Sequence, residues 1–325
     1  MASGNTNFAT LASITLQNFA NEIFDNVITN NRTLSELQKA GNIKIVGGGR
    51  EFLHPVYYQK NNTFAAIDKN GTIPTDLQDP LTRAKYDIKT LAGSITYNLV
   101  EDAMNAGNKE KLIDYVEALK MDAETSMTEL MGDQMYTADS AVGSVNFDSI
   151  PRFISTAPSV QTTDPGNIAS DDTTNTYWHN YTDATTVSAF GTSVGLLAMD
   201  NAINGSTYGR QGPTFIITTK AVYSLFNASL QANQRFTDPD RAAAGFKNLL
   251  YTTLPVMFDD NCPTGRMYFI DANALRLQVL AQGNMKMSSF QEAYSQLQAR
   301  ALLFILGNLT CGSRRTQGVI NSITG

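Results

Sequence analysis

Apolar positions repeat with two different periods along this chain. Between residues 108 and 136 they recur every three or four residues, which predicts an amphipathic helix. Asn108 stands at its start and is a favourable N-cap residue. At 1.5 Å per residue such a helix is about 40 Å long. The heptad run is too short for a coiled coil, so we expect one apolar stripe that packs on a broad surface.

Two other segments have the character of β-strands. Residues 51–59 are rich in aromatic and β-branched side chains, and residues 85–99 alternate between apolar and polar positions. Residues 60–82 between them contain the Asn, Asp, Gly and Pro combinations that favour turns and loops. The pattern predicts an extended hairpin over residues 46–99, whose second strand alone reaches about 50 Å at 3.3 Å per residue.

A two-stranded hairpin of this length is only marginally stable by itself in water. It therefore needs a surface to pack on, which is either a neighbouring copy of the chain or a larger sheet of the same chain. The periodicity favours neither alternative. At its base, Gly47, Gly48 and Gly49 predict a flexible hinge rather than a phosphate-binding loop, because no Lys-Ser or Lys-Thr pair follows them.

The rest of the chain mixes helices, strands and irregular segments. A helix is predicted from about 187 to 204, with Phe190, Val194, Leu197 and Ile203 on its buried face. The remaining predictions are a short helix near 12–29, loops and short strands over 137–186, a helix over 220–232, and strands at 214–218, 254–258, 266–270, 278–290 and 297–311. This order predicts an α+β protein without an internal repeat.

Composition points to contacts between copies but does not establish them. Charged residues make up 17% of the 325 residues, below the usual value of about 25%. A surface rich in uncharged polar groups is buried against copies of itself at low desolvation cost, although an ordinary soluble protein fits this composition too. The net charge of −6 and the pI near 5.0 argue against tight nucleic-acid binding by the whole surface.

The sequence contains no recognisable leader, membrane segment or metal motif. Its N-terminus lacks the basic and apolar regions of a signal peptide, and its longest apolar run is too short to span a bilayer. Cys262 and Cys311 are far apart and form neither a metal-binding spacing nor a disulfide framework. We therefore expect a protein of a reducing cytoplasm, with no cofactor, no metal and no membrane partner.

One short motif suggests catalysis, and its surroundings argue against it. Residues 191–195 read Gly-Thr-Ser-Val-Gly, the nucleophile-elbow pattern of serine hydrolases. They lie within a predicted helix, and both histidines, His54 and His179, precede them. Two Asp-Asp pairs, at 171–172 and 259–260, lack the spacing of a calcium loop and are interpreted as turn residues. The sequence therefore predicts no catalytic residue and no enzyme.

Taken in order, these segments resemble the major capsid proteins of tailed double-stranded-DNA bacteriophages, which have the HK97-like fold. The most specific stretch is Thr-Phe-Ile-Ile-Thr-Thr-Lys at 214–220 with the helix after it. Residues 254–270 then follow the pattern of a strand, Asp, Pro-x-Gly and an aromatic strand, before the Leu-x-Leu of residues 275–277. The ending at 307–319 is similar as well, so the resemblance covers nearly the whole chain.

The resemblance implies a division of the chain into an N-terminal arm, an extended hairpin called the E-loop, a peripheral (P) domain and an axial (A) domain. The implied ranges are 1–45 for the arm, 46–99 for the E-loop, 96–150 and 284–312 for the P-domain with its spine helix at 108–136, and 151–283 and 313–325 for the A-domain.

The resemblance also implies a function. A protein of this family is a structural subunit that self-assembles, as hexamers and pentamers, into the icosahedral head shell around the phage genome. Implied partners are other copies of the chain, a portal, a decoration protein, and packaged double-stranded DNA held by weak non-specific contact. Because no long scaffold-like domain precedes the arm, a separate scaffolding protein or earlier cleavage is implied. The implied location is the virion head, after assembly in the host bacterial cytoplasm.

Candidate contacts between copies lie on the hairpin and near the C-terminus. Lys60 and Lys69 fall on the hairpin loop, where the type member of the family carries its crosslinking lysine, although no crosslinking partner can be assigned. An arginine pair near the end of the chain suits carboxylates on a neighbour, because the guanidinium is a planar fork. The candidates are Tyr57, Tyr58, Lys60, Lys69, Arg83, Lys85, Arg314 and Arg315.

Three alternatives remain open from the sequence. An encapsulin-like bacterial nanocompartment shares the fold and differs in its contents, which are an enzyme cargo rather than DNA. An enzyme would need a nucleophile, a base and an orienting group that converge, and the chain supplies none. A tail or decoration protein is usually all-β, which disagrees with the long predicted helix.

Overall fold

The computed structural model describes residues 31–100, 109–137, 144–183, 190, 193–229, 249–292 and 296–324. These residues form two compact units. One contains Ala92–Glu129 and Met287–Leu303, and the other contains Asn30–Leu91, Leu130–Lys286 and Phe304–Gly325. The predicted helix at 12–29 lies outside the described residues. The predicted P- and A-domain boundaries remain a prediction.

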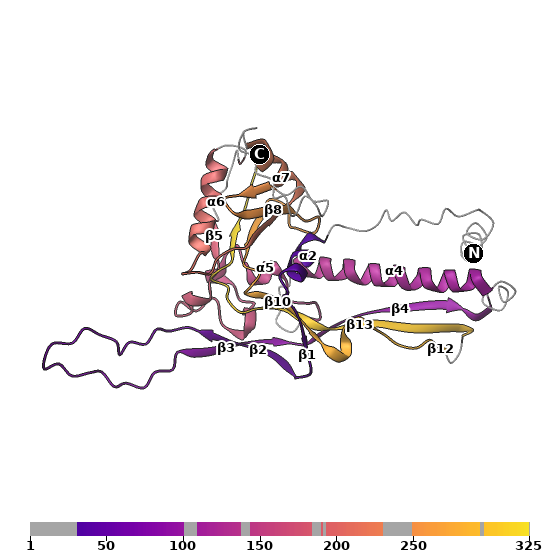
Figure 1. The fold of residues 1–325 in the computed structure, drawn as a ribbon, viewed down its shortest axis with the longest axis horizontal. Coiled ribbons are helices and arrows are strands. Elements are labelled where there is room, and N and C mark those ends of the chain that lie inside the picture. The colour runs from indigo at the N-terminus through magenta and orange to yellow at the C-terminus, as the bar shows by residue number, and fades with distance from the viewer. Residues whose placement is uncertain are drawn as a thin grey trace. The chain divides into compact units, whose positions relative to one another are not determined.

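The predicted hairpin is present at its base. Strand β2 (Glu51–Tyr57) pairs antiparallel with β3 (Leu81–Asp87), from Glu51 opposite Asp87 to Tyr57 opposite Leu81. Both strands alternate between exposed and covered positions, because one face of the ribbon packs on the protein while the other faces solvent. Beyond the paired residues the chain continues as an open loop that extends away from the two strands (Figure 1).

The second strand of the hairpin is shorter than predicted. The strand expected over residues 85–99 is interrupted at Ile88, and its second half, β4 (Lys89–Asn98), pairs with β13 (Gln298–Cys311) instead of β2. A partner distant in sequence lies at the interruption: Asn308 Nδ2 donates a 2.9 Å hydrogen bond to the carbonyl oxygen of Asp87. The alternating pattern continues through the break, so the sequence predicted one long strand and was wrong about the hairpin's second half.

The long helix is present as α4 (Lys109–Tyr136), within one residue of the predicted start. In the smaller unit Met127 is 3% exposed, and its methyl group lies 4.0 Å from the position that a Cβ on Gly93 would occupy. The same unit contains β12 (Gln291–Glu292), which pairs with Ala299 and Arg300 of β13. Tyr97 of β4 contacts Phe290 edge to face at 5.1 Å.

A six-stranded mixed sheet provides the core of the larger unit. Its order is β5-β14-β9-β6-β8-β7, with β6 parallel to β8 and antiparallel to β9. Helix α6 (Ser193–Ser206) packs on β5 and β14, and α7 (Lys220–Ser229) packs on β8. The strands are β5 (Tyr181–Asp183), β6 (Phe215–Thr218), β7 (Leu249–Tyr251), β8 (Leu254–Phe258), β9 (Met267–Ile270) and β14 (Gly318–Ile320). The predicted strands at 214–218, 254–258 and 266–270 are confirmed.

Helix α6 buries a different face from the predicted one. Phe190 is buried and Ile203 packs partly against the core, as expected. Val194 and Leu197, however, are 53% and 61% exposed, and the core instead receives Ala198, Met199 and Ala202. Apolar residues surround this helix on more than one side, so their period predicts the helix without selecting its buried face.

A second group of strands and an unpredicted helix complete the larger unit. Strand β1 (Ile43–Val46) runs parallel to β10 (Leu275–Leu280), which pairs antiparallel with the last part of β13. Short β11 (Lys286–Met287) lies next to β13 in the strand order. Helix α2 (Arg32–Lys39) is not predicted by the apolar pattern of the sequence. Thr33 donates its backbone N–H (3.1 Å) and its hydroxyl (2.7 Å) to Asp259 Oδ2. The carboxylate that caps the first turn of α2 therefore lies 226 residues from Thr33 in the sequence.

The segment from 144 to 183 is irregular, as predicted. It contains the single-turn helix α5 (Ile150–Phe153) and the short 3-10 helices η1 (Pro158–Val160), η2 (Pro165–Asn167) and η3 (Thr176–Trp178). A further 3-10 turn, η5 (Ala281–Gly283), follows β10. Trp178 is 1% exposed, and its indole donates a 2.8 Å hydrogen bond to the carbonyl of Pro165, so the segment has a core without long elements.

Candidate assembly surface

The base of the hairpin is attached to the body of the larger unit by buried polar contacts. Tyr86 of β3 is 2% exposed, and its hydroxyl donates a 2.7 Å hydrogen bond to the carbonyl of Cys311. Its ring packs edge to face on Phe153. Burial raises the pKa of the Tyr86 hydroxyl, which therefore stays protonated as a donor. The hairpin base thus has a fixed place on its own chain.

His54 provides a second attachment from β2. Its Nε2 lies 3.1 Å from the hydroxyl of Thr310, and that hydroxyl donates to the carbonyl of Arg276. The imidazole is therefore the donor in the first of these bonds. Burial, and then the nearby charge of Arg276, lower the pKa of His54 to about 4. His54 is consequently neutral at pH 7 and has a structural role.

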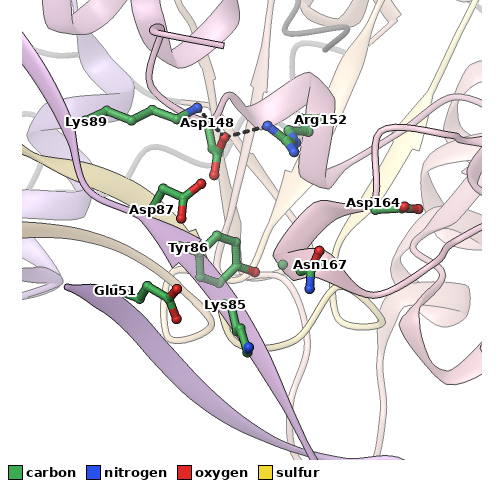
Figure 2. Close-up of a pocket in the computed structure, with 10 residues that line it drawn as sticks. Glu51, Lys85, Tyr86, Asp87, Lys89, Asp148, Arg152, Asp164 and Asn167 are labelled. Atoms are coloured by element: carbon green, nitrogen blue, oxygen red, sulfur yellow. Dashed lines mark hydrogen bonds and ion pairs between the residues drawn. The ribbon is translucent and has the colours of Figure 1, made fainter. Parts of the chain in front are cut away.

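A polar network holds the point where β3 ends and β4 begins (Figure 2). Asp148 accepts from Lys89 Nζ at 2.9 Å and from Arg152 at 2.7 Å, and its other oxygen accepts from Asn308 at 3.0 Å. The network borders a cavity of about 230 Å³ that is also lined by Glu51, Lys85, Asp87 and Asp164. Charges of both signs line it and are partly paired with one another, so its residues serve to fix the hairpin rather than to form an evident ligand site.

The tip of the hairpin, residues 58–80, has the opposite character. Leu77 is fully exposed, Phe64 is 85% exposed and Ile73 is 65% exposed. The hydrogen bonds recorded for the tip are local, such as Gly71 N to the Asp68 carbonyl and Tyr58 N to the Pro80 carbonyl across the neck. Large apolar side chains gathered on one exposed loop are typical of an interaction surface.

Six of the eight candidate contact residues lie on this hairpin, all at least partly accessible. Tyr57 is 77% exposed and Tyr58 is 36% exposed, with its ring 5.7 Å from that of Tyr177. Arg83 and Lys85 lie on the outer face of β3, next to one another in the pleat. Lys60 and Lys69 are exposed on the tip. Their role in contacts between copies remains a prediction.

The adjacent arginines near the C-terminus differ from one another. Arg314 is 0% exposed and donates to the Phe153 carbonyl, Ser170 Oγ and Gln161 Oε1 at 2.6–2.7 Å. The prediction that Arg314 contacts another subunit is therefore wrong, because its guanidinium is buried and hydrogen-bonded within its own chain. Arg315 is partly exposed and lies over the ring of Tyr208, with Cζ 3.5 Å from the ring centroid.

The three hinge candidates are exposed between β1 and β2. A Cβ added to Gly47 or Gly48 would meet no atom within 4 Å. Gly49 has a φ of +148°, which disfavours other residues. Space and backbone geometry are compatible with a hinge, and its movement remains a prediction.

The described residues give no support to the motifs that were set aside as catalytic or metal-binding. Within them, no group of three or more His, Cys, Asp or Glu side chains is placed to hold a metal ion. Asp259 is 2% exposed and accepts from the start of α2, so it is a capping residue. Among the helices that the structure describes, none has the length and apolarity needed to cross a membrane.

Solved structures with a similar fold include the capsids of a cyanophage and of a GTA particle. The capsid of cyanophage A-1(L) superposes with a TM-score of 0.71 at 18% identity, over 96% of this chain and 98% of that one. The capsid of a native GTA particle covers 100% of both chains, with a TM-score of 0.61 at 10% identity. This chain has the HK97-like capsid fold. The E-loop is therefore the β2–β3 hairpin with its tip, and the spine helix is α4.

The same fold also occurs in an encapsulin. The holo-SrpI encapsulin complex from Synechococcus elongatus PCC 7942 superposes with a TM-score of 0.58 at 9% identity, over 96% of this chain and 95% of that one. No protein-family model and no curated protein matches the sequence. The similarity is therefore seen in the arrangement of the elements, which these proteins share at sequence identities of 9–18%.

Proposed function

We propose that this chain is the shell-forming subunit of a phage head and assembles in many copies into a closed icosahedral shell. The observation that carries the proposal is the E-loop tip, which exposes Phe64, Ile73 and Leu77 and, among the described residues, makes local hydrogen bonds only. Apolar surface of this kind gains free energy when another molecule covers it. The likeness to capsids over nearly the whole chain supports a further copy of the chain as that molecule.

The proposed role is structural rather than enzymatic. Each contact between copies is heterologous, and repetition around a closed shell makes modest contacts collectively stable. We propose hexamers and pentamers as the building units, with the A-domain around their axes and the P-domain at their periphery. Gly47, Gly48 and Gly49 would let the E-loop change direction between non-equivalent positions.

Other partners follow from the same proposal. We propose a portal, a separate scaffolding protein and a decoration protein as further partners of the head. The net charge of −6 favours weak, non-specific contact with packaged double-stranded DNA rather than tight binding. The proposed location is the virion head, after assembly in the host bacterial cytoplasm.

Shortening the E-loop tests the proposal directly. Replacing residues 59–79 by Asn-Gly joins the neck through a two-residue turn that suits a hairpin. We expect the shortened chain to fold and to sediment as a monomer or small oligomer, whereas the natural chain sediments as a large particle. The exposed substitution Asn70→Ser, which keeps the tip and its apolar side chains, is the matched control and should assemble normally. Normal shells from the shortened chain would refute the role of the E-loop.

An encapsulin-like nanocompartment is the second candidate, because the SrpI encapsulin shares the fold. Both candidates predict the same sedimentation and differ in what the particle holds. Electron microscopy and analysis of the contents of particles from the native source separate them: DNA and a tail vertex support the phage head, and a protein cargo supports the nanocompartment.

A further inference from the structure

The E-loop tip contains an Asn-Gly pair, Asn70-Gly71, whose side-chain amide lies next to a reactive backbone nitrogen. In any asparagine, the nitrogen of the following residue is placed to attack the side-chain carbonyl carbon. Glycine in the following position favours this attack, because it has no Cβ that obstructs the approach or restricts the backbone. Both residues of the pair are exposed. The tip therefore has the sequence and the accessibility that spontaneous deamidation requires.

A tight turn explains why glycine follows asparagine at this point. Gly71 N–H donates a 2.8 Å hydrogen bond to the carbonyl of Asp68, and Lys69 N–H donates to Asp68 Oδ1 at 2.7 Å. A Cβ on Gly71 would overlap Cγ2 of Ile67 and lie 3.2 Å from the carbonyl oxygen of Asp68. The turn thus requires glycine, and the reactive pair is a consequence of how the tip folds.

The backbone around the pair is free to adopt the geometry of attack. Ring closure requires rotation at Asn70, so that its Cγ faces the nitrogen of Gly71. Asn70 lies in a turn, and residues 71–80 after it belong to no helix or strand. Within the described part of the chain, no hydrogen bond holds the Asn70 side chain. A single turn hydrogen bond on an exposed loop opens at little cost in free energy.

A second Asn-Gly pair provides an internal comparison. Asn204 and Gly205 lie in helix α6, which fixes the backbone of Asn204 and uses the N–H of Gly205 in its hydrogen-bond ladder. A Cβ on Gly205 would overlap the ring of Tyr181, so this part of the helix is tightly packed. The two pairs have the same covalent chemistry, and the fold protects the one in the helix.

We propose that Asn70 is a site of spontaneous deamidation in the unassembled chain. The nitrogen of Gly71 bonds to Cγ of Asn70, its proton passes to the side-chain nitrogen, and that nitrogen leaves as ammonia. The product is a five-membered succinimide ring. Water then opens the ring at either of its carbonyl carbons, so that residue 70 becomes aspartate or isoaspartate. The balance is one water consumed and one ammonia released, without an oxidant, a reductant or a cofactor.

Deamidation changes the charge of the tip. Within residues 61–79, three carboxylates against one ammonium give a net charge of −2, and the new carboxylate makes it −3. The new charge arises between Ile67, which is 41% exposed, and Ile73, which is 65% exposed. A molecule that covers these apolar side chains would have to remove the charge from water, which costs free energy. The carboxylates are Asp68, Asp76 and Asp79, and the ammonium is Lys69.

The isoaspartate product changes the backbone as well. It adds a methylene group to the main chain at residue 70, which moves the nitrogen of Gly71 away from its acceptor at Asp68. Aged copies should therefore join a shell less readily, and copies whose tip is covered should deamidate more slowly. This consequence rests on the proposed function, whereas the modification site does not.

Peptide mapping of the full, unassembled chain tests the site. The chain is incubated in mildly alkaline buffer and digested with trypsin, which cleaves after Lys69 and Arg83 and releases peptide 70–83. Two new forms of this peptide, equal in mass and separable by chromatography, should accumulate with the mass gain of replacing NH₂ by OH. Mildly acidic buffer should slow them, because the attacking nitrogen must lose a proton. Asn204 in peptide 153–210 should react at least about tenfold more slowly, because helix α6 must open first.

The yield of particles tests the consequence. Asn70→Asp reproduces one of the products and should lower the yield roughly two- to fivefold, as expected when a contact gains one partly exposed charge. The matched control, Asn70→Ser, cannot deamidate at this position and should keep its yield after the same incubation. The natural chain should lose yield in step with the change in peptide 70–83. Thermal unfolding should be the same for all three fresh chains, because the side chain is exposed.

The outcomes separate this inference from the proposed function. An unchanged peptide 70–83, or equal rates at Asn70 and Asn204, would overturn the modification site and leave the shell function standing. Equal yields from Asn70→Asp and Asn70→Ser would overturn the effect on assembly. A fresh natural chain that never forms particles would overturn the function itself, and the peptide map would still decide the site.

Discussion

The base and the tip of the E-loop differ in sequence and have opposite surroundings. The base places Phe52, Tyr86 and His54 against the body of its own chain. The tip places Phe64 and Leu77 in solvent. The tip is dominated by turn-forming and polar residues, but it also carries large apolar side chains that no residue of its own chain covers among those that the structure describes. The difference teaches that the folding of one chain covers the apolar side chains of the base and leaves those of the tip exposed, which is where the proposed function places a second copy.

The largest expected effect is at Tyr86, the largest of the buried side chains of the base. Replacement of Tyr86 by Ala removes its packing on Phe153 and its bond to the Cys311 carbonyl, and should lower the free energy of unfolding by about 3–5 kcal/mol. The matched change is Tyr57→Ala on the outer face, which should stay within about 0.5 kcal/mol. Denaturant unfolding measures the free energy of unfolding of both variants. Similar losses would show that the buried and the outer face of the base contribute equally to stability.

Acid should weaken the same attachment through His54. Its pKa is lowered to about 4 in the folded protein, from the usual 6.5, so the unfolded chain binds more protons between pH 6.5 and 4. This contribution to stability is complete above pH 6.5 and is lost as the pH falls toward 4, by about 2 kcal/mol at pH 5. Unfolding measured against pH should show this loss in the natural chain and a smaller loss in His54→Gln. An unchanged pH dependence in the variant would argue against a neutral, buried imidazole.

The hinge glycines allow a smaller comparison. Ala at Gly49 must adopt a φ near +148°, which should cost about 1 kcal/mol in the free energy of unfolding, while Ala at Gly48 meets open space and should cost little. Equal costs at the two positions would mean that backbone geometry is not what requires Gly49. If these residues act as a hinge, particle size distributions should also change more for Gly49→Ala.

The smallest effect on folding is expected at the tip itself. Leu77→Ser should leave the free energy of unfolding within about 0.5 kcal/mol, because the side chain is fully exposed in the single chain. It should nevertheless reduce assembly, because the apolar surface that a neighbour covers has been removed. Thermal unfolding of the unassembled chain and sedimentation of the particles measure the two effects separately. A loss of stability without a loss of assembly would mean that Leu77 stabilises the single chain and does not contribute to contacts between copies.

Local periodicity specifies neither the long-range partners of a segment nor, where apolar residues surround a helix, the face that is buried. Alternation over residues 85–99 predicts one strand, but the side chain of Asn308 engages Asp87 and β4 finds β13 instead. The start of α2 has no local cap and depends on Asp259. Helix α6 was located correctly, yet Val194 and Leu197 face outward because apolar residues occur on more than one side of it.

The sequence by itself determined the order and type of the main elements: the long helix, the strand at 215–218 with the helix after it, the glycines before the hairpin and the turn-rich segment between its strands. These follow from side-chain period and turn chemistry, which act over a few residues. Only the tertiary structure decided which of two adjacent arginines is buried. Arg314 and Arg315 have the same side chain. The chain folds so that Arg314 donates to Phe153, Ser170 and Gln161, while Arg315 stacks on the ring of Tyr208.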